Sequence, residues 1–239
     1  MKKLIGTIVI AAFSTFSVNA ETIENIKSQI LDTSVSVGIT GTAGMLEADG
    51  KETMSFQGIT GDQAKKSEDL FLAYASIFAE VHMPMNFRVG LSYVPYSLES
   101  KTTESVQRSL TTAQGGTGEA DKTQKVKASI EDLASLYVSY HLDMSAFTGF
   151  VKAGLMQADL VTNEKLSSNS KYGNADLEGQ FIGIGIDKSM SNGIFIRGEA
   201  VKTRFDDIAL KSTGSRNKNI IDITGLDGTN LSVSIGKTF

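Results

Sequence analysis

The chain has 239 residues, no cysteine and a net charge of −4, and 41% of its residues are hydrophobic. The absence of cysteine excludes a disulfide framework and a thiolate metal site. The acidic balance, without any basic stripe, argues against a nucleic-acid-binding protein. Beyond the N-terminus, no apolar run reaches the roughly 18 residues that a transmembrane helix needs, but spanning β-strands, which are only about half apolar, stay possible.

The first 20 residues, MKKLIGTIVIAAFSTFSVNA, have the three parts of a secretory signal peptide. Lys2 and Lys3 form a basic start, an apolar stretch follows, and the segment ends in the small-x-small cleavage pattern VNA. The sequence therefore predicts an exported protein with a signal peptide over residues 1–20. Its removal changes the net charge from −4 to −6, because two lysines are lost and no acidic residue is lost with them.

The segment that follows, residues 21–33, has a different periodicity from the rest of the chain. Its apolar residues recur at helical spacing, at Ile23, Ile26, Ile30 and Leu31. Thr22 is a suitable N-cap for such a helix. We expect a short periplasmic N-terminal helix here, ahead of the main domain.

From residue 34 onward apolar and polar residues alternate, which is typical of β-strands with two different faces. Eight segments share the pattern, and QFIGIGID has it most clearly, with Ile182, Ile184 and Ile186 on one face and glycines on the other. Short polar turns are expected near residues 84–86, 143–146 and 188–192. Long polar loops are expected near residues 45–69, 99–125, 160–176 and 207–219.

The regular alternation of short and long connections places every long loop at one end of a barrel with an even number of strands. The presumed outer face carries Val, Ile, Leu and Ala, and the inner face carries Gly, Ser, Thr and scattered charges. A soluble barrel has the reverse distribution. We therefore expect an all-β, eight-stranded antiparallel up-and-down transmembrane β-barrel over residues 34–239. It would lie in a bacterial outer membrane, in contact with outer-membrane lipid and lipopolysaccharide.

The final segment, LSVSIGKTF, places apolar residues at two-residue spacing before an aromatic end, at Leu231, Val233, Ile235 and Phe239. In its strand pattern and in this ending, the chain resembles the small eight-stranded outer-membrane barrels of Gram-negative bacteria, the OmpA-transmembrane-domain and OmpX-like group. The resemblance implies that these four residues form a C-terminal assembly signal, read by the barrel-assembly machinery during insertion. Lys237 departs slightly from that pattern, at a position suited to snorkelling.

The lumen of an eight-stranded barrel is about wide enough to be filled by side chains, so charges inside it should pair. The inward charged candidates are Glu80, Arg88, Lys152, Asp187, Arg197 and Glu199. Glu80 and Arg88 flank the Pro84 turn on one face and are expected to pair across it. Arg197 and Glu199 occupy adjacent inward positions on one strand. This lumen charge network favours a structural plug, and a gated path for small ions is the alternative.

Four polar loops on one narrow barrel favour a structural and surface-display role, with the loops contacting an extracellular ligand. A narrow porin-like channel for ions or small solutes is the alternative. A lipid-modifying enzyme is less favoured, because His82 and His141 lie beside short turns and no G-x-S-x-G motif is present. No metal-ligand cluster stands out, and no cofactor is expected.

Overall fold

The computed structural model describes residues 34–56, 59–99, 103–107, 122–165, 172–213 and 219–239. The predicted signal peptide, residues 1–20, and the predicted helix, residues 21–33, lie outside this part of the chain. Within it, no helix has the length and apolar character needed to span a bilayer.

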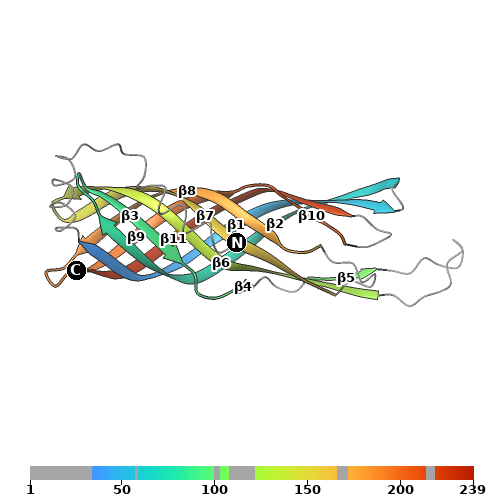
Figure 1. Ribbon diagram of the computed structural model, residues 1–239, viewed down its shortest axis with the longest axis horizontal. Helices are drawn as coiled ribbons and strands as arrows, with labels where there is room; N and C mark the ends of the chain where they lie inside the picture. The colour runs from blue at the N-terminus through green and yellow to red at the C-terminus, as the bar shows by residue number, and fades with distance from the viewer. Residues whose placement is uncertain (1–33, 57–58, 100–102, 108–121, 166–171, 214–218) are drawn as a thin grey trace, which may run out of the picture. The chain divides into compact units, whose positions relative to one another are not determined.

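Eight antiparallel strands form a closed ring, drawn in Figure 1. In ring order they are β1 (Val35–Phe56), β2 (Ile59–His82), β3 (Phe87–Tyr93), β6 (Lys122–Met144), β7 (Phe147–Lys165), β8 (Ala175–Ser189), β9 (Ile194–Phe205) and β11 (Ile220–Thr238). The ring closes because β1 also pairs with β11, and the N–H groups of Val35 and Phe239 each donate to the carbonyl of the other. The predicted eight-stranded barrel is confirmed.

Three shorter strands continue ring strands after a break. They are β4 (Leu98–Glu99), β5 (Thr103–Gln107) and β10 (Ile208–Lys211). β4 and β5 pair with β6, as β3 does, and β10 pairs with β11, as β9 does. The break after β3 contains Pro95, which has no N–H for the ladder. The β2–β3 ladder ends there, at Ile77 opposite Tyr93, and within the described residues β2 has no strand partner on that side beyond Ile77.

Tight turns join the strands at one end of the barrel, as predicted. They lie at residues 84–86, 145–146 and 191–193. Gly193 has a φ of 81°, a left-handed conformation that favours glycine, and a Cβ there would lie 2.7 Å from the carbonyl oxygen of Thr238. The turn is therefore packed directly against the last strand.

The prediction of a long loop was wrong for residues 45–69 and for the parts of the other segments that belong to strands, whereas residues 100–102, 108–121, 166–171 and 214–218 lie outside the described part of the chain. β1 and β2 pair with each other as far as Phe56 opposite Ile59, which makes residues 45–69 a long hairpin that Figure 1 shows reaching away from the short turns. β7 continues to Lys165, and β6 already begins at Lys122. These polar segments stay in the ladder because backbone hydrogen bonds, which do not depend on apolar side chains, hold them there.

Exposed apolar side chains surround the part of the barrel nearest the short turns, and we call this band the lipid belt. On β1 it runs from Val35 to Met45, and on β8 it comprises Ile182, Ile184 and Ile186. About 11 residues at ~3.3 Å each, tilted by ~40°, cover ~28 Å, close to the ~25 Å apolar band of transmembrane barrels. The predicted parity, with apolar residues outward, is confirmed for this half of the molecule.

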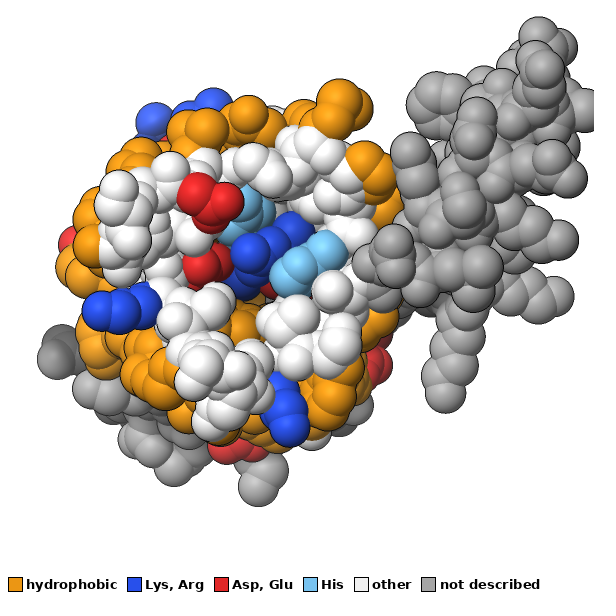
Figure 2. Space-filling model, turned by 90° about the vertical axis from the view of Figure 1, so that its left-hand side faces the viewer, with side chains coloured by type: hydrophobic (Ala, Val, Ile, Leu, Met, Phe, Trp, Pro, Cys, Tyr) orange, Lys and Arg blue, Asp and Glu red, His pale blue; other side chains and the backbone are white. Residues whose placement is uncertain are grey.

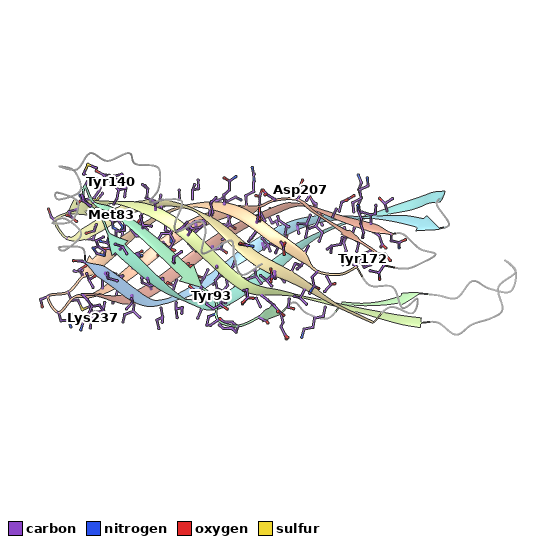
Figure 3. All side chains as sticks on the ribbon, in the orientation of Figure 1. Met83, Tyr93, Tyr140, Tyr172, Asp207 and Lys237 are labelled. Carbon is purple, nitrogen blue, oxygen red and sulfur yellow. The ribbon has the colours of Figure 1, made fainter. Side chains whose placement is uncertain are left out.

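Figure 3 shows both edges of the lipid belt. The residues labelled at the short-turn end are Met83, Tyr140 and Lys237. Tyr93 lies near the other edge, whereas Tyr172 and Asp207 lie further along the barrel, where the strands have left the belt. Because outer-membrane barrels have short turns on the periplasmic side, we expect the part beyond Tyr93 to be extracellular. We call it the extension.

In the extension the polarity of the two strand faces reverses. On β1 the exposed residues change from Met45 to Glu47 and Asp49, while Leu46 and Ala48 turn inward. The buried centre of the resulting apolar cluster consists of Ala158, Leu177, Phe205 and Leu226. Apolar residues inside and charges outside are the arrangement of a soluble barrel. The extension therefore has its own apolar core and an outer surface whose polarity suits water.

Candidate functional site inside the barrel

Aromatic rings inside the barrel pack on glycines of the neighbouring strand at the same register. Tyr137 on β6 is paired with Gly90 on β3, and a Cβ on Gly90 would collide with the phenol ring. The same relation joins Phe78 with Gly38, Phe150 with Gly185, Phe181 with Gly154, Phe195 with Gly236, and Phe205 with Gly179. The inward glycines thus make room for large rings in a narrow lumen.

A cluster of charged side chains closes the lumen near the short turns, and Figure 2 shows basic, acidic and histidine side chains gathered at the centre of this end. Nη1 and Nη2 of Arg197 donate to the two carboxylate oxygens of Glu80, at 2.6 and 2.9 Å. The hydroxyl of Tyr137 donates to the same carboxylate at 2.9 Å. Both side chains are buried: Glu80 is fully enclosed, and 3% of Arg197 is exposed. Because β11 and β1 separate their strands in the ring, this ion pair crosses the lumen.

Asp187 on β8 is the second acid of the cluster and is paired in register with Arg197 on β9. Nη1 of Arg88 donates to Oδ2 of Asp187 at 3.4 Å and lies 3.6 Å from Oε2 of Glu80. Nη2 of Arg197 lies 3.7 Å from Oδ2 of Asp187. Two carboxylates and two guanidiniums therefore form one network in which each acid faces both arginines. We call these four residues the plug.

Three phenylalanine rings enclose the guanidinium of Arg197. Its central carbon lies 5.6, 5.1 and 5.2 Å from the ring centroids of Phe78, Phe150 and Phe195, respectively. The rings attract the cation through their quadrupoles and keep water away from it. The plug is therefore held by packing as well as by charge.

His141 lies beside the plug and has the neighbours of a Ser–His–Asp triad. Its Nε2 is hydrogen-bonded to the hydroxyl of Ser139 at 2.9 Å, and its Nδ1 lies 3.4 Å from Oδ2 of Asp187. Ser139 is only 2% exposed, and its histidine is stacked on Phe150 with ring centroids 5.1 Å apart. Because the hydroxyl and the imidazole are both buried and packed against a ring, the geometry fits packing better than catalysis. Among the described residues, no cluster of His, Asp and Glu is arranged to hold a metal ion.

A second ion pair lies apart from the plug. Nζ of Lys152 donates to both carboxylate oxygens of Glu199 at 2.7 Å and stands 4.6 Å from the ring centroid of Tyr137. Their strands, β7 and β9, flank β8, whose residues in register with this pair are Gly183 and Gly185. Because these positions have no side chain, lysine and glutamate meet across β8.

A cavity of about 80 Å³ adjoins this second pair. Paired hydroxyls on neighbouring strands line it, namely Thr40 with Ser234, Thr42 with Ser232, and Ser92 with Ser135, at 2.8, 2.9 and 2.7 Å. Arg197 of the plug borders the cavity, and Leu133 and Met156, which pack on the apolar cluster of the extension, border it too. Polar walls of this kind suit a few water molecules. The lumen thus has three layers: plug, polar cavity and apolar cluster.

The six charges expected in the lumen lie in two groups. Glu80 and Arg88 approach each other as the sequence suggested, but the shortest ionic contact of Glu80 is with Arg197. Glu199 is bonded to Lys152 rather than to the neighbouring Arg197. The hydrogen bond from the hydroxyl of Tyr137 to Glu80 of the plug was missed, because the two residues are 57 positions apart in the sequence. The sequence signal that could have indicated this contact is Gly90, an inward glycine on β3, which lies in register between Glu80 on β2 and Tyr137 on β6.

The C-terminal residues lie on the outer surface. Leu231, Val233 and Ile235 belong to the lipid belt on β11, and 71% of Phe239 is exposed. Nζ of Lys237 stands 5.0 Å from the ring centroid of Phe239, as expected of a snorkelling lysine at the belt edge. Their reading by an assembly machinery stays a prediction.

No protein-family model matches this chain, and no curated protein sequence matches it. Solved structures do. The outer membrane protein OprG from Pseudomonas aeruginosa is 15% identical over 85% of this chain and 95% of that one, with a TM-score of 0.52. Neisserial surface protein A is 12% identical over 82% and 99%, with a TM-score of 0.37. Ail of Yersinia pestis is 10% identical over 83% and 99%, with a TM-score of 0.34. The likeness to OprG is one of fold, that of the small eight-stranded outer-membrane β-barrels.

Proposed function

We propose that this outer-membrane β-barrel is a structural and surface-display protein whose lumen has no open axial path. The bidentate contact between Arg197 and Glu80 carries the proposal, because it crosses the lumen and both side chains are buried. An ion moving along the axis has to separate these charges. Leaving one of them buried without its partner costs about 3–5 kcal/mol.

The extension supports the display role. Residues 59–70 of β2 alone add about 12 residues beyond the lipid belt, which is ~40 Å measured along the strand. The apolar cluster fills the extension next to the lipid belt, where Leu46 and Ala48 of β1 pack on it, while Glu47 and Asp49 are exposed on the outer surface. The paired ends of β1 and β2 are therefore held beyond the lipid belt, at a place that an extracellular ligand can reach.

Planar-bilayer recording on refolded protein tests the closed lumen, and silent bilayers are the expected result. Replacement of residues 108–121 by a short Gly-Ser linker tests the display role. The variant should keep the heat-modifiable gel mobility of a folded barrel, while binding to host or phage surfaces changes. Failure of this variant to fold would show that the segment is part of the scaffold and not a display element.

A second candidate function is the passage of small polar solutes through the side of the barrel. The polar cavity reaches the break after β3, since Tyr74 and Ser76 of β2 and Ser92 and Val94 on the other side all line it. In the part of the chain that the structure describes, no backbone ladder joins β2 to another strand on this side beyond Ile77. The sequence suggested a channel along the barrel axis as the alternative function. The break after β3 favours instead a passage through the side wall of the barrel.

An engineered disulfide across the break tests the lateral passage, because the native chain has no cysteine to interfere. Ile77 and Tyr93 are the last register partners before the break, and partners on neighbouring strands have the Cα spacing that a disulfide needs, so a cysteine pair at these positions would hold the edge of the break together. In a liposome-swelling assay, solute uptake that stops on oxidation and returns on reduction supports the passage. Equal swelling in both states, or none at all, excludes it.

A further inference from the structure

An apolar groove with a volume of about 670 Å³ crosses the lipid-facing surface from β6 to β9, outside the lumen. Two adjacent rows of register partners form it. The first row is Val138, Ala153, Ile182 and Lys202, and the second is Tyr140, Val151, Ile184 and Ala200. The groove therefore runs obliquely across four neighbouring strands of the lipid belt.

The hollow exists because each row contains one alanine. Ala153 and Ala200 are both exposed, and their row neighbours Val151, Ile182 and Ile184 are larger and branched. A hollow between branched apolar side chains on a membrane surface offers a single hydrocarbon chain more contact than a smooth wall does. Its volume lies within the range of small-ligand sites.

The two ends of the groove differ in chemistry. At the short-turn end stand the rings of Phe87 and Tyr140, with centroids 5.0 Å apart. At the other end stands Lys202, opposite Thr229 on β11. Within the described residues Lys202 has no ion pair shorter than 4 Å, and the nearby carboxylate of Asp227 is held by Arg204 through two hydrogen bonds of 2.9 and 3.3 Å.

We propose that this groove binds an acyl chain of a phosphorylated glycolipid of the outer leaflet, with its phosphate on the ammonium of Lys202 and the hydroxyl of Thr229. The assignment to the outer leaflet follows from the orientation of the barrel. Short turns face the periplasm, so Lys202 lies at the extracellular edge of the lipid belt. A phosphate anchored there directs its acyl chain down the groove toward Phe87. The proposal rests on the outer-membrane fold and is independent of display or transport.

Lipid titration followed by native mass spectrometry of the refolded full-length barrel tests the site, with bisphosphorylated lipid A and phosphatidylglycerol as probes. Wild type should retain lipid A more strongly than phosphatidylglycerol. Lys202→Glu should weaken lipid A binding by at least about fivefold, the effect of losing one lysine near an anionic headgroup. Ala200→Leu, which fills the groove and leaves the charge, should also weaken it.

Lys188→Glu is the matched control, because Lys188 is exposed on β8 at the short-turn end and does not line the groove. This variant should bind lipid A as wild type does. The side chains at all three positions point outward. Unchanged heat-modifiable gel mobility establishes that each variant folds. Equal lipid A binding by wild type, Lys202→Glu and Ala200→Leu overturns the site. So does an equal loss in Lys188→Glu, and equal binding of the two probes overturns the glycolipid as the occupant.

Discussion

Arg197 and Glu80 lie 117 residues apart in the sequence and are joined across the lumen by two hydrogen bonds of 2.6 and 2.9 Å. Glu80 belongs to β2 and Arg197 to β9, and β1 and β11 lie between these two strands in the ring. The pair therefore fixes the distance between two walls of the barrel. Its removal should change both the stability and the permeability of the protein.

For stability, Glu80→Gln should lower the free energy of unfolding by about 3–5 kcal/mol, because the buried Arg197 loses its bidentate carboxylate and keeps only the 3.7 Å contact with Asp187. Urea unfolding in detergent micelles, followed by far-UV circular dichroism, measures this change. Tryptophan fluorescence cannot be used, since the chain has no tryptophan. The double variant Glu80→Gln/Arg197→Met should recover part of the loss. A double variant less stable than Glu80→Gln would contradict an ion pair that holds the walls together.

For permeability, Arg197→Ala should convert a silent barrel into one with steady conductance in planar bilayers. The substitution removes the side chain that fills the space between three phenylalanine rings and leaves Glu80 facing the lumen. A negatively charged opening should pass cations in preference to anions. Lys152→Ala is the control, because Lys152 belongs to the second ion pair and leaves the plug intact. Silent recordings from Arg197→Ala would show that the plug is not the barrier.

Glycine packing gives a third prediction. Gly90→Ala should destabilise the barrel by about 1–3 kcal/mol, the usual effect of overpacking, because its methyl group meets the ring of Tyr137. Gly198→Ala should be nearly neutral, since nothing lies within 4 Å of a Cβ at that position. Unfolding curves of the two variants under the same conditions make the comparison. Similar losses for both would mean that backbone freedom, rather than the ring, is what matters at glycine.

The separate core of the extension gives a fourth prediction. Phe205→Ala should loosen the extension by about 3–5 kcal/mol, because the ring is part of its buried cluster. Limited proteolysis of the refolded protein should then cut the strands of the extension, while a fragment that contains the lipid belt stays protected. Ile182 faces lipid, so Ile182→Ala should leave the extension resistant to proteolysis. Loss of the whole barrel in the Phe205→Ala variant would show that belt and extension unfold as one unit.

The C-terminal residue gives a fifth prediction. Phe239→Ala should reduce insertion into the outer membrane of living cells, whereas refolding into micelles should proceed as in the wild type. The two outcomes separate recognition from stability, because the backbone hydrogen bonds between Phe239 and Val35 do not depend on the ring. Fractionation and heat-modifiable mobility measure the first outcome, and refolding yield measures the second. An equal defect in both assays would assign the ring a purely structural role.

Local alternation was enough to predict the barrel and its turns. Ile182, Ile184 and Ile186 could be placed on the lipid side because side chains of successive strand residues point to opposite faces. The same rule failed at Met45, where the sequence becomes polar and was interpreted as loop. Beyond Met45 the strand continues and the same alternate positions face outward, but the outward residues are now polar and the inward ones apolar. The reason is that the surroundings of the strand change from lipid to water. The two-residue period of a strand is the same in lipid and in water. The change from apolar to polar outward residues therefore reflects the change of surroundings and not the end of the strand.

The sequence by itself determined which residues face inward, including all six charges of the lumen, since that property depends only on position along one strand. Only the tertiary structure decided that Arg197 meets Glu80 and that Lys152 meets Glu199. These partners depend on how eight strands are staggered and closed into a ring, and a shift of one strand by two residues keeps every face and changes every neighbour. Pairing across a lumen is thus a property of the closed barrel, whereas orientation is a property of each strand.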